Sequence, residues 1–369
     1  MKYIVVSPKN RTVYNFRGDL IREIIRCSHE VTVTGPNKID VGKIEALGAA
    51  FAEIPNDKNG INPLADLKYL MRLFGLFRRE KPDVVFGYTS KPVIYGSIAA
   101  RLSGVSHIAA MVTGAGYAFA AETRKAKMIR SILSVLYKLA FRCADVVIFQ
   151  NRDDMGQFVE EKLVKEEKCR LVNGSGVNME KFTPAPYPET VTFFMLARMI
   201  YAKGIREYLQ ACELVKQKHP EVRCMILGNC ENLPDAISEA ELASYVQRGI
   251  VEHFGETDTV ADYYRQCSVF VLPSCYREGT PRTILEAMAM GRPIITTDAP
   301  GCRETVITGE NGYLVPVRDS NAVAEAMLRF VEHPERIKTM GQKSLEYCRE
   351  RYDVRKVNAD MCRYLKAYM

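Results

Sequence analysis

The 369-residue sequence predicts an α/β protein with two doubly wound, Rossmann-like parallel sheets. The first observation is that short β-rich runs alternate with amphipathic helical stretches along nearly the whole chain. The second is that this alternation begins afresh near residue 191, after a proline-rich segment. The third is the length, because domains commonly have about 150 residues and a chain of 369 residues is therefore long enough for two. Ligands gather at the carboxyl ends of the strands in such sheets, so we expect the active site in a central cleft that both domains face.

Five strands are predicted in each half, because these runs are short, apolar and bounded by turn residues. In the first half they are Tyr3–Ser7, Glu30–Thr34, Val84–Gly87, His107–Val112 and Val146–Gln150. In the second half they are Val191–Ala197, Arg223–Leu227, Ile250–Phe254, Val269–Leu272 and Pro293–Thr296.

A linker is expected at residues 182–190, where the sequence FTPAPYPE has three prolines that disfavour helix and central strand. It would separate an N-terminal domain of residues 1–181 from a C-terminal domain of residues 191–353. The last helical stretch, residues 354–369, follows the elements of the second domain. We expect it to pack back on the first domain.

Positive charge is concentrated in the first half. Residues 1–183 contain 28 Lys and Arg against 19 Asp and Glu (net +9), whereas the remainder contains 23 against 25 (net −2). An anionic partner should therefore meet the N-terminal half first. Nucleic acid is not the expected partner, because positive charge is the only feature that favours it.

Two basic amphipathic stretches, at residues 68–81 and 124–142, contribute much of this charge. Helices of this kind can lie on an anionic bilayer, so an anionic membrane surface is a predicted partner. The alternative is that their apolar residues are core and their cations solvate the outer face.

No metal or cofactor is expected. The eleven cysteines are scattered without a C-x-x-C pair, and the five histidines lack the spacing of a metal site. The start, MKYIVVS, does not resemble a secretory signal, and glycines break the uncharged run Leu102–Ala121. We interpret that run as a buried strand and a glycine loop, and we expect a cytoplasmic protein.

The loop after the fourth strand of the second half contains the residues best suited to a ligand. Glu278 and Gly279 lie in this loop, and Gly279 allows a ligand to approach the backbone closely. Thr280 and Pro281 are predicted to begin a helix, as capping hydroxyl and first helical residue, and the free amides of its first turn suit a diphosphate. Glu286, about one and a half turns later, could accept hydrogen bonds from ribose hydroxyls. The alternative is a solvated Glu278 and an ordinary helix-face Glu286.

Two cations follow the first strand of the second half. Arg198 stands at the carboxyl end of an apolar run, and Lys203 precedes the next helix. The planar fork of Arg and the point charge of Lys can converge on a pair of phosphates. The alternative is two unrelated surface cations.

This arrangement resembles glycosyltransferase family 4, a retaining family with the GT-B fold. The shared features are Glu278 and Glu286 separated by seven residues, Arg198 and Lys203 upstream, and the GSGVN sequence at 174–178. The similarity covers nearly the full chain. Within the family, the sequence is most similar to bacterial N-acetylgalactosaminyltransferases acting on undecaprenyl-diphosphate-linked sugars and to capsule and O-antigen transferases. The segments that carry this similarity are 131–151, 174–182 and 223–232.

The resemblance implies transfer of a hexose or N-acetylhexosamine from a UDP-sugar to a polyprenyl-diphosphate-linked saccharide, with retention of configuration. The pathway would be bacterial surface-glycan or glycoprotein-glycan assembly. The first domain would bind this lipid-linked acceptor, and the protein would be peripheral on the cytoplasmic face of the inner membrane.

The resemblance also implies a role for each matching residue. Arg198 and Lys203 would hold the donor diphosphate and stabilise its departing charge. Glu278 would contact the donor sugar and Glu286 the ribose, while Gly279–Pro281 would shape the diphosphate loop.

Two features depart from the family pattern. Many relatives have a histidine immediately before the glycine loop of the first domain, but here Thr113 precedes Gly114, which places the contribution of that histidine in doubt. The first loop also lacks the paired glycines of many relatives. Asn15 and Arg17 are the residues of that loop expected on the acceptor side, with Thr113 and Gly114. An ordinary strand-to-helix loop is the alternative.

Two other functions would use the same donor site. A UDP-sugar epimerase or hydrolase of GT-B fold would need groups for proton removal but no acceptor. The other is a non-catalytic subunit that binds a nucleotide sugar. Thr113 favours this alternative, because it stands where many relatives have the histidine. Incubation with UDP-sugars alone distinguishes the epimerase or hydrolase from the transferase.

Overall fold

The chain forms two compact units, each with its own parallel sheet. The first unit comprises Met1–Ser175 and Val354–Met369, and the second comprises Gly176–Asp353. The computed structural model describes residues 1–57, 62–116, 124–231, 233 and 235–368.

The first unit contains a seven-stranded sheet in the order β3-β2-β1-β4-β5-β6-β7, with all neighbouring strands parallel. The strand order changes direction between β1 and β4, and this topological switch point is where such sheets bind ligands. The strands are β1 (Lys2–Val6), β2 (Glu30–Gly35), β3 (Ala50–Glu53), β4 (Val84–Tyr88), β5 (His107–Val112), β6 (Val146–Phe149) and β7 (Cys169–Leu171).

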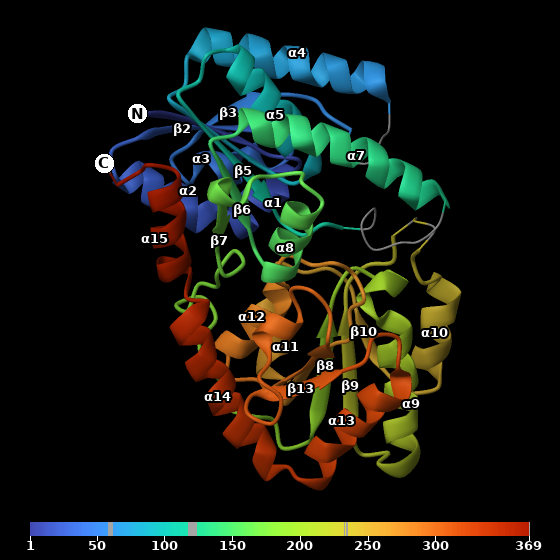
Figure 1. Cartoon of the computed structure of the whole chain (residues 1–369). Coiled ribbons are helices and arrows are strands. Elements are labelled where there is room, and N and C mark those ends of the chain that lie inside the picture. Colours follow the sequence, from blue (N-terminus) through green and yellow to red (C-terminus); the bar gives the residue numbers. More distant parts are fainter. Residues whose placement is uncertain (58–61, 117–123, 232, 234, 369) are drawn as a thin grey trace. The chain divides into compact units, whose positions relative to one another are not determined.

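Helices cover both faces of this sheet, and a separate apolar cluster fills each interface. On one face α4, α5 and α7 lie side by side, with α5 between the other two (Figure 1). On the other face α15 packs against α2. The helices are α1 (Asn10–Phe16), α2 (Gly18–Arg26), α3 (Val41–Glu45), α4 (Pro63–Glu80), α5 (Ser90–Leu102), α7 (Arg124–Cys143), α8 (Arg152–Glu160) and α15 (Val354–Tyr364).

The second unit contains a six-stranded parallel sheet in the order β10-β9-β8-β11-β12-β13, with its switch point between β8 and β11. Its strands are β8 (Thr192–Leu196), β9 (Arg223–Leu227), β10 (Glu252–Phe254), β11 (Val269–Leu272), β12 (Ile294–Thr297) and β13 (Gly312–Val315). Its helices are α9 (Ile205–Lys218), α10 (Glu239–Gln247), α11 (Val260–Arg265), α12 (Arg282–Ala289), α13 (Ser320–Glu332) and α14 (Glu335–Arg351).

The predicted fold class is confirmed, because both sheets are parallel and doubly wound. Each predicted strand coincides with an observed one to within two residues at either end. The sequence does not predict β3, β7 and β13. All three lie at sheet edges and contain at most four residues.

The segment predicted as a linker, residues 182–190, belongs instead to the second unit, because the division falls between Ser175 and Gly176. Phe182 is buried in the core of that unit, and the hydroxyl of Tyr187 donates to the carbonyl of Gly291 at 2.7 Å. The prolines exclude regular backbone pairing, but they leave these aromatic side chains able to pack.

Backbone carbonyls of the C-terminal segment receive hydrogen bonds from the first unit. His107 Nε2 lies 2.8 Å from the carbonyl oxygen of Tyr364, and the hydroxyl of Tyr3 lies 3.1 Å from that of Leu365. His29 Nε2 lies 3.0 Å from the carbonyl oxygen of Ala367. Val354–Met369 is therefore a structural part of the first unit.

Candidate active site

The residues predicted to bind a ligand in the second unit follow the two strands that flank its switch point. Arg198 and Lys203 come after β8, and Glu278 and Gly279 come after β11. β8 and β11 are hydrogen-bonded neighbours. Because the carboxyl ends of adjacent parallel strands meet at one edge, the topology places all four residues at that edge of the sheet.

Gly204 allows the loop after β8 to touch the loop after β11. It has a φ of 80°, in the left-handed region, and it is the N-cap of α9. A Cβ atom added there would lie 2.1 Å from the carbonyl oxygen of Pro273. Both observations require glycine. The resulting close approach brings Lys203 against the loop after β11.

Lys203 and Glu278 form an ion pair, with Nζ donating to Oε1. Their side chains are only 15% and 12% exposed. The hydroxyl of Ser274 donates to the same carboxylate oxygen at 3.2 Å, and Nζ lies 5.3 Å from the centroid of the Tyr276 ring. An ammonium and a carboxylate far apart in sequence therefore meet at the edge of the sheet.

Gly301 fixes the backbone of the Glu278 loop from the neighbouring turn. Its φ is 78°, and an added Cβ atom would lie 2.3 Å from the carbonyl oxygen of Gly279 and 2.7 Å from that of Glu278. Sequence reasoning missed Gly301. The signal was a Pro-Gly pair shortly after a strand, which marks a turn.

α12 begins one residue later than predicted. Its first residue is Arg282, and its N-cap is Pro281 in an extended conformation, without a side-chain cap. Thr280 is therefore not the helix cap. It is 8% exposed and precedes the cap. The N-terminus of α12 still follows directly after the Glu278 loop, and the positive end of a helix dipole favours an anion there.

Glu286 belongs to a separate buried cluster on α12. It is 8% exposed, accepts a hydrogen bond from Arg282 Nε at 3.0 Å, and accepts another from the hydroxyl of Tyr264 at 3.2 Å. Burial raises the pKa of the Glu286 carboxyl, and the interactions with Arg282 and Tyr264 partly offset that effect. Sequence reasoning did not identify Arg282 or Tyr264 as partners of this carboxylate.

Arg198 pairs with a different carboxylate from Lys203. Its guanidinium lies 3.9 Å from Glu231, and its side chain is 48% exposed. An exposed pair at this distance stabilises the fold little, so the guanidinium is available to a stronger anion. This edge of the sheet therefore carries the buried ammonium of Lys203 and the accessible guanidinium of Arg198, and both groups suit a phosphate ligand. The carboxylates beside them can accept hydrogen bonds from hydroxyl groups.

Arg17, predicted on the acceptor side, is buried in the first unit. It is 4% exposed, its Nη2 lies 3.1 Å from the sulfur of Met111, and its guanidinium lies 5.3 Å from the centroid of the Tyr88 ring. The Tyr88 hydroxyl is 2.9 Å from that of Thr12. Arg17 therefore packs inside the first unit, against side chains of β4 and β5.

The other first-unit candidates are less buried. Asn15 is half-buried on α1. Thr113 directly follows β5 and is also half-buried, and Gly114 has a φ of 115°. Tyr117, which completes the glycine loop of the sequence, lies outside the described residues.

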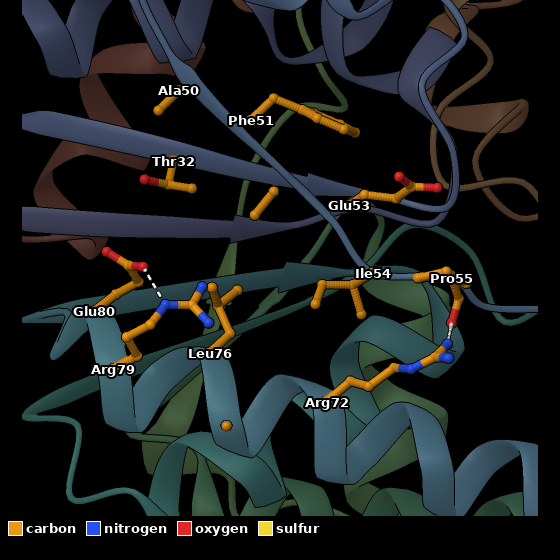
Figure 2. Close-up of a pocket in the computed structure, with 12 residues that line it drawn as sticks. Thr32, Ala50, Phe51, Glu53, Ile54, Pro55, Arg72, Leu76, Arg79 and Glu80 are labelled. Atoms are coloured by element: carbon orange, nitrogen blue, oxygen red, sulfur yellow. Dashed lines mark hydrogen bonds and ion pairs between the residues drawn. The ribbon is translucent and has the colours of Figure 1, made fainter.

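A cavity of about 870 Å³ lies in the first unit between α4, the edge strand β3 and its neighbour β2 (Figure 2). Arg72 and Arg79 border it from α4. Arg72 donates to the carbonyl of Pro55 at 3.4 Å, and Arg79 pairs with Glu80 at 2.9 Å. Both side chains run from α4 toward the strands on the cavity side of the helix (Figure 2).

In the described part of the chain, no three His, Cys, Asp or Glu side chains are grouped as metal ligands would be. Nor does any helix among the described residues combine the length and apolar character needed to cross a bilayer.

A glycosyltransferase family model matches each of the two units. Residues 4–151 match a family model described as "Glycosyl transferase 4-like", and residues 190–333 match one described as "Glycosyl transferases group 1". Both matches lie within the doubly wound sheets and their helices.

Two relatives and one solved structure resemble the chain over most of its length. N,N'-diacetylbacillosaminyl-diphospho-undecaprenol alpha-1,3-N-acetylgalactosaminyltransferase of Campylobacter jejuni is 25% identical, covering 100% of this chain and 98% of its own. UDP-Gal:alpha-D-GlcNAc-diphosphoundecaprenol alpha-1,3-galactosyltransferase of Escherichia coli is 27% identical over 76% of this chain and 74% of its own. HepE of Anabaena, solved with UDP-glucose, has a TM-score of 0.78 at 17% identity and full coverage of both chains.

Proposed function

Because the chain belongs to the glycosyltransferases, with a glycosyl transferase 4-like first domain and a group 1 second domain, we propose that it transfers a hexose or N-acetylhexosamine from a UDP-sugar to a polyprenyl-diphosphate-linked saccharide, with retention of configuration. The observation that carries this proposal is the convergence of Lys203 and Glu278 beside the start of α12. The substrates named for the two relatives, and the UDP-glucose of the HepE structure, support the choice of donor and acceptor.

The donor diphosphate would bind Lys203, Arg198 and the first-turn amides of α12. In the unliganded site Lys203 and Arg198 are paired with Glu278 and Glu231. A diphosphate offers each cation a more highly charged partner, and Glu278 is then free to accept a hydrogen bond from a sugar hydroxyl. Glu286 would bind the ribose.

These groups also explain how the transfer is accelerated. Negative charge grows on the diphosphate as the glycosidic bond breaks. Fixed cations and helix amides already aimed at that charge stabilise the transition state without reorganisation. The acceptor oxygen then forms the new bond at the anomeric carbon, its hydroxyl proton passes to the departing diphosphate, and UDP leaves.

A lipid-linked acceptor would meet the enzyme at a membrane, and we propose that the first unit docks there reversibly, on the cytoplasmic face of the inner membrane. On α7, four apolar side chains at positions i, i+4, i+7 and i+11 point outward and are between 46% and 69% exposed. They are Met128, Ile132, Val135 and Leu139. The opposite face of α7, with Tyr137 and Phe141, is buried. The outer stripe is therefore not needed for the core, and such stripes mark interaction sites.

α4 carries a similar stripe on the same side of the sheet. Leu64, Leu67 and Met71 are each more than half exposed, and the same helix carries the cavity-lining cations Arg72 and Arg79. Apolar side chains bordered by cations suit an anionic bilayer, where the apolar groups enter the interface and each cation contributes about 1 kcal/mol.

Calorimetric titration with UDP tests the donor site. We expect Arg198→Ala and Lys203→Ala each to weaken UDP binding by about tenfold or more, because each removes a charge-assisted hydrogen bond to phosphate. Arg248→Ala is a matched control for Arg198, since Arg248 is 45% exposed and pairs with Glu213 elsewhere in the second unit. Equal affinity in all variants would refute the donor site.

Product analysis tests the reaction itself. Incubation with UDP-hexoses and a polyprenyl-diphosphate-linked N-acetylhexosamine should yield an extended lipid-linked saccharide and UDP. Release of free sugar or a change of epimer at the same rate without acceptor would support a hydrolase or an epimerase instead.

A further inference from the structure

Each oxygen of the Glu286 carboxylate accepts a hydrogen bond from a different helix. Oε1 accepts from Arg282 Nε at 3.0 Å, one turn earlier on α12, and Oε2 accepts from the hydroxyl of Tyr264 on α11 at 3.2 Å. The plane of the carboxylate is therefore fixed. A carboxylate has about four acceptor sites, so one protein donor on each oxygen leaves it able to accept two further hydrogen bonds.

The three side chains of this cluster differ in exposure. The side chains of Glu286 and Arg282 keep 11% and 14% of their surface exposed, whereas Tyr264 is fully buried. A ligand at the surface of the second unit can therefore touch the carboxylate but not Tyr264. Any effect of Tyr264 on ligand binding must act through the groups that it holds.

Tyr264 is anchored through both its ring and its main chain. The ring makes edge-to-face contacts with Phe182 and Phe194, at centroid distances of 6.2 and 5.4 Å. The carbonyl of Tyr264 accepts a hydrogen bond from Arg292 Nε at 3.1 Å, and Arg292 is itself fully buried. Because such aromatic contacts and a buried guanidinium hold the residue, its hydroxyl has a defined position.

The Tyr264 hydroxyl acts as a donor toward Glu286. Burial and the charge of Glu286 raise the pKa of Tyr264 well above its ordinary value, so the hydroxyl keeps its proton. The hydroxyl also lies 2.9 Å from the carbonyl oxygen of Thr283, which aligns Tyr264 with α12. The ionised carboxylate is the stronger acceptor of the two, because hydrogen bonds to charged groups are stronger than those between neutral groups.

The charge of Glu286 depends on the same neighbours. Burial raises the pKa of its carboxyl, whereas the Arg282 guanidinium, the Tyr264 hydroxyl and the Lys181 ammonium lower it. These three groups come from α12, from α11 and from the segment that precedes α9. The ionised form matters for a ligand with two hydroxyls, because only an ionised carboxylate is an acceptor at both oxygens without donating a proton itself.

We propose that Tyr264 and Arg282 are positioning residues that hold Glu286 as a two-oxygen acceptor for both hydroxyls of the donor ribose. This inference rests on the proposed function, in which Glu286 binds the ribose, and it adds the groups that make the buried carboxylate selective for a cis-diol. A cis-diol presents two donors side by side, which match the two oxygens of one carboxylate. The protein should therefore discriminate against a nucleotide without ribose hydroxyls, and this discrimination should depend on Tyr264.

Calorimetric titration of the full-length protein with UDP and with 2′,3′-dideoxy-UDP, which lacks both ribose hydroxyls, tests this role. We expect the wild type to prefer UDP by about tenfold or more, because hydroxyl donors to a charged group are lost in the dideoxy nucleotide. In Tyr264→Phe, which removes one hydroxyl from the protein, this preference should fall about threefold or more. The affinity for 2′,3′-dideoxy-UDP should stay within about twofold of wild type, because that nucleotide does not use the Glu286 contact.

Arg282→Gln is the second variant, and it should also reduce the preference about threefold or more, because a neutral amide holds the carboxylate more weakly. Loss of the Arg282 charge near the start of α12 weakens diphosphate binding as well, but this affects both nucleotides alike and cancels in the ratio. Tyr208→Phe is the matched control for Tyr264→Phe. Tyr208 is a fully buried tyrosine of the same unit, and its hydroxyl donates to the carbonyl of Met225 at 2.9 Å. Its preference for UDP should match wild type.

The pH dependence of the preference distinguishes positioning from a general loss of stability. Protonation of Glu286 should abolish the preference as the pH falls. Because the hydrogen bond from Tyr264 lowers the pKa of Glu286, Tyr264→Phe raises that pKa, and the variant should lose its preference at a higher pH than wild type. Titration of the phosphates is common to both nucleotides and does not enter the ratio.

Three outcomes would overturn this inference. The first is an unchanged preference in both Tyr264→Phe and Arg282→Gln, and the second is an equal loss of affinity for the two nucleotides in Tyr264→Phe. The third is equal binding of UDP and 2′,3′-dideoxy-UDP by the wild type, which would also remove the ribose contact of Glu286. Failure of the wild type to bind UDP at all would count against the proposed function itself, whereas intact UDP binding with an unchanged preference in the variants counts only against the positioning role.

Discussion

Lys203 and Glu278 neutralise each other in the unliganded protein. Both side chains are largely buried, and either charge left alone at such a position would be costly. The pair therefore keeps an ammonium next to the start of α12, where the diphosphate of the proposed donor would compete for it. Glu286 is held differently, by Arg282 and Tyr264 inside the second unit.

This difference predicts distinct kinetic effects for the two carboxylates. Glu286→Gln should raise the donor KM and weaken UDP binding by about tenfold, because a ribose contact is made in ground and transition states alike. Glu278→Gln should lower kcat by about 100-fold with a small change in UDP affinity, because its sugar contact strengthens as charge develops. Steady-state kinetics and UDP titration of both variants measure this division of roles.

The sequence predicts the charged residues of the proposed donor site, because each stands just after a strand or inside the following helix. It does not identify which charges meet. Lys203 and Glu278 are 75 residues apart, and their contact depends on β8 and β11 being neighbours. The glycines at 204 and 301 are likewise ordinary in sequence, and only the approach of a second loop shows why no side chain fits there.

At the scale of elements, most strands found from the sequence contain an apolar run. The sequence does not predict the short edge strands β3, β7 and β13, whereas it does predict the equally short edge strand β10, because the apolar residues Ile250 and Val251 precede it. The start of α12 is misplaced by one residue because Thr and Pro together fit two capping schemes. In the structure proline occupies the cap itself.

α15 depends on a buried histidine of β5, and its stability should therefore depend on pH. His107 is 8% exposed, and burial lowers its pKa below the ordinary value of 6.5, with Lys366 acting in the same direction and the Tyr364 carbonyl and Asp145 opposing. The folded protein thus favours the neutral ring more than the unfolded chain does. This contribution to stability is complete above pH 6.5 and is lost as the pH falls below that value.

We expect His107→Gln to lower the free energy of unfolding at pH 7.5 by about 1 kcal/mol, the net value of one hydrogen bond. Urea titrations at pH 7.5 and pH 5.5 should show that the difference between wild type and variant becomes smaller at the lower pH. A difference that is constant or larger at pH 5.5 would contradict the assignment of a neutral, buried ring.

At the scale of the whole molecule, positive charge and exposed apolar stripes occur together in the first unit. Residues 1–183 have a net charge of +9, and the stripes of α4 and α7 belong to the same part of the chain. The sequence alone left open whether these apolar residues were core. The structure shows that both helices have a buried face and a separate exposed apolar stripe.

Co-sedimentation of the full-length protein with vesicles tests membrane docking. Binding should require anionic lipid and weaken with salt, because surface attraction is screened beyond about 10 Å at 0.1 M salt. Val135→Asp should reduce binding by about tenfold, since it places a negative charge in the α7 stripe.

Val246→Asp is the control for this substitution, because Val246 is a 39% exposed valine on a helix of the second unit, and its binding should match wild type. Equal binding to neutral and anionic vesicles would exclude the electrostatic part of the proposal. Equal loss in both variants would exclude a specific role for α7.

The sequence by itself determined the class of fold, most strand positions and the glycosyltransferase family. These properties are local, because periodicity, turn residues and motif spacing are written in consecutive residues. The tertiary structure decided that Lys203 meets Glu278, that Arg17 is buried and that residues 182–190 pack in the second unit. Each of these depends on strand order and on the close approach of loops, which join residues that are remote in sequence.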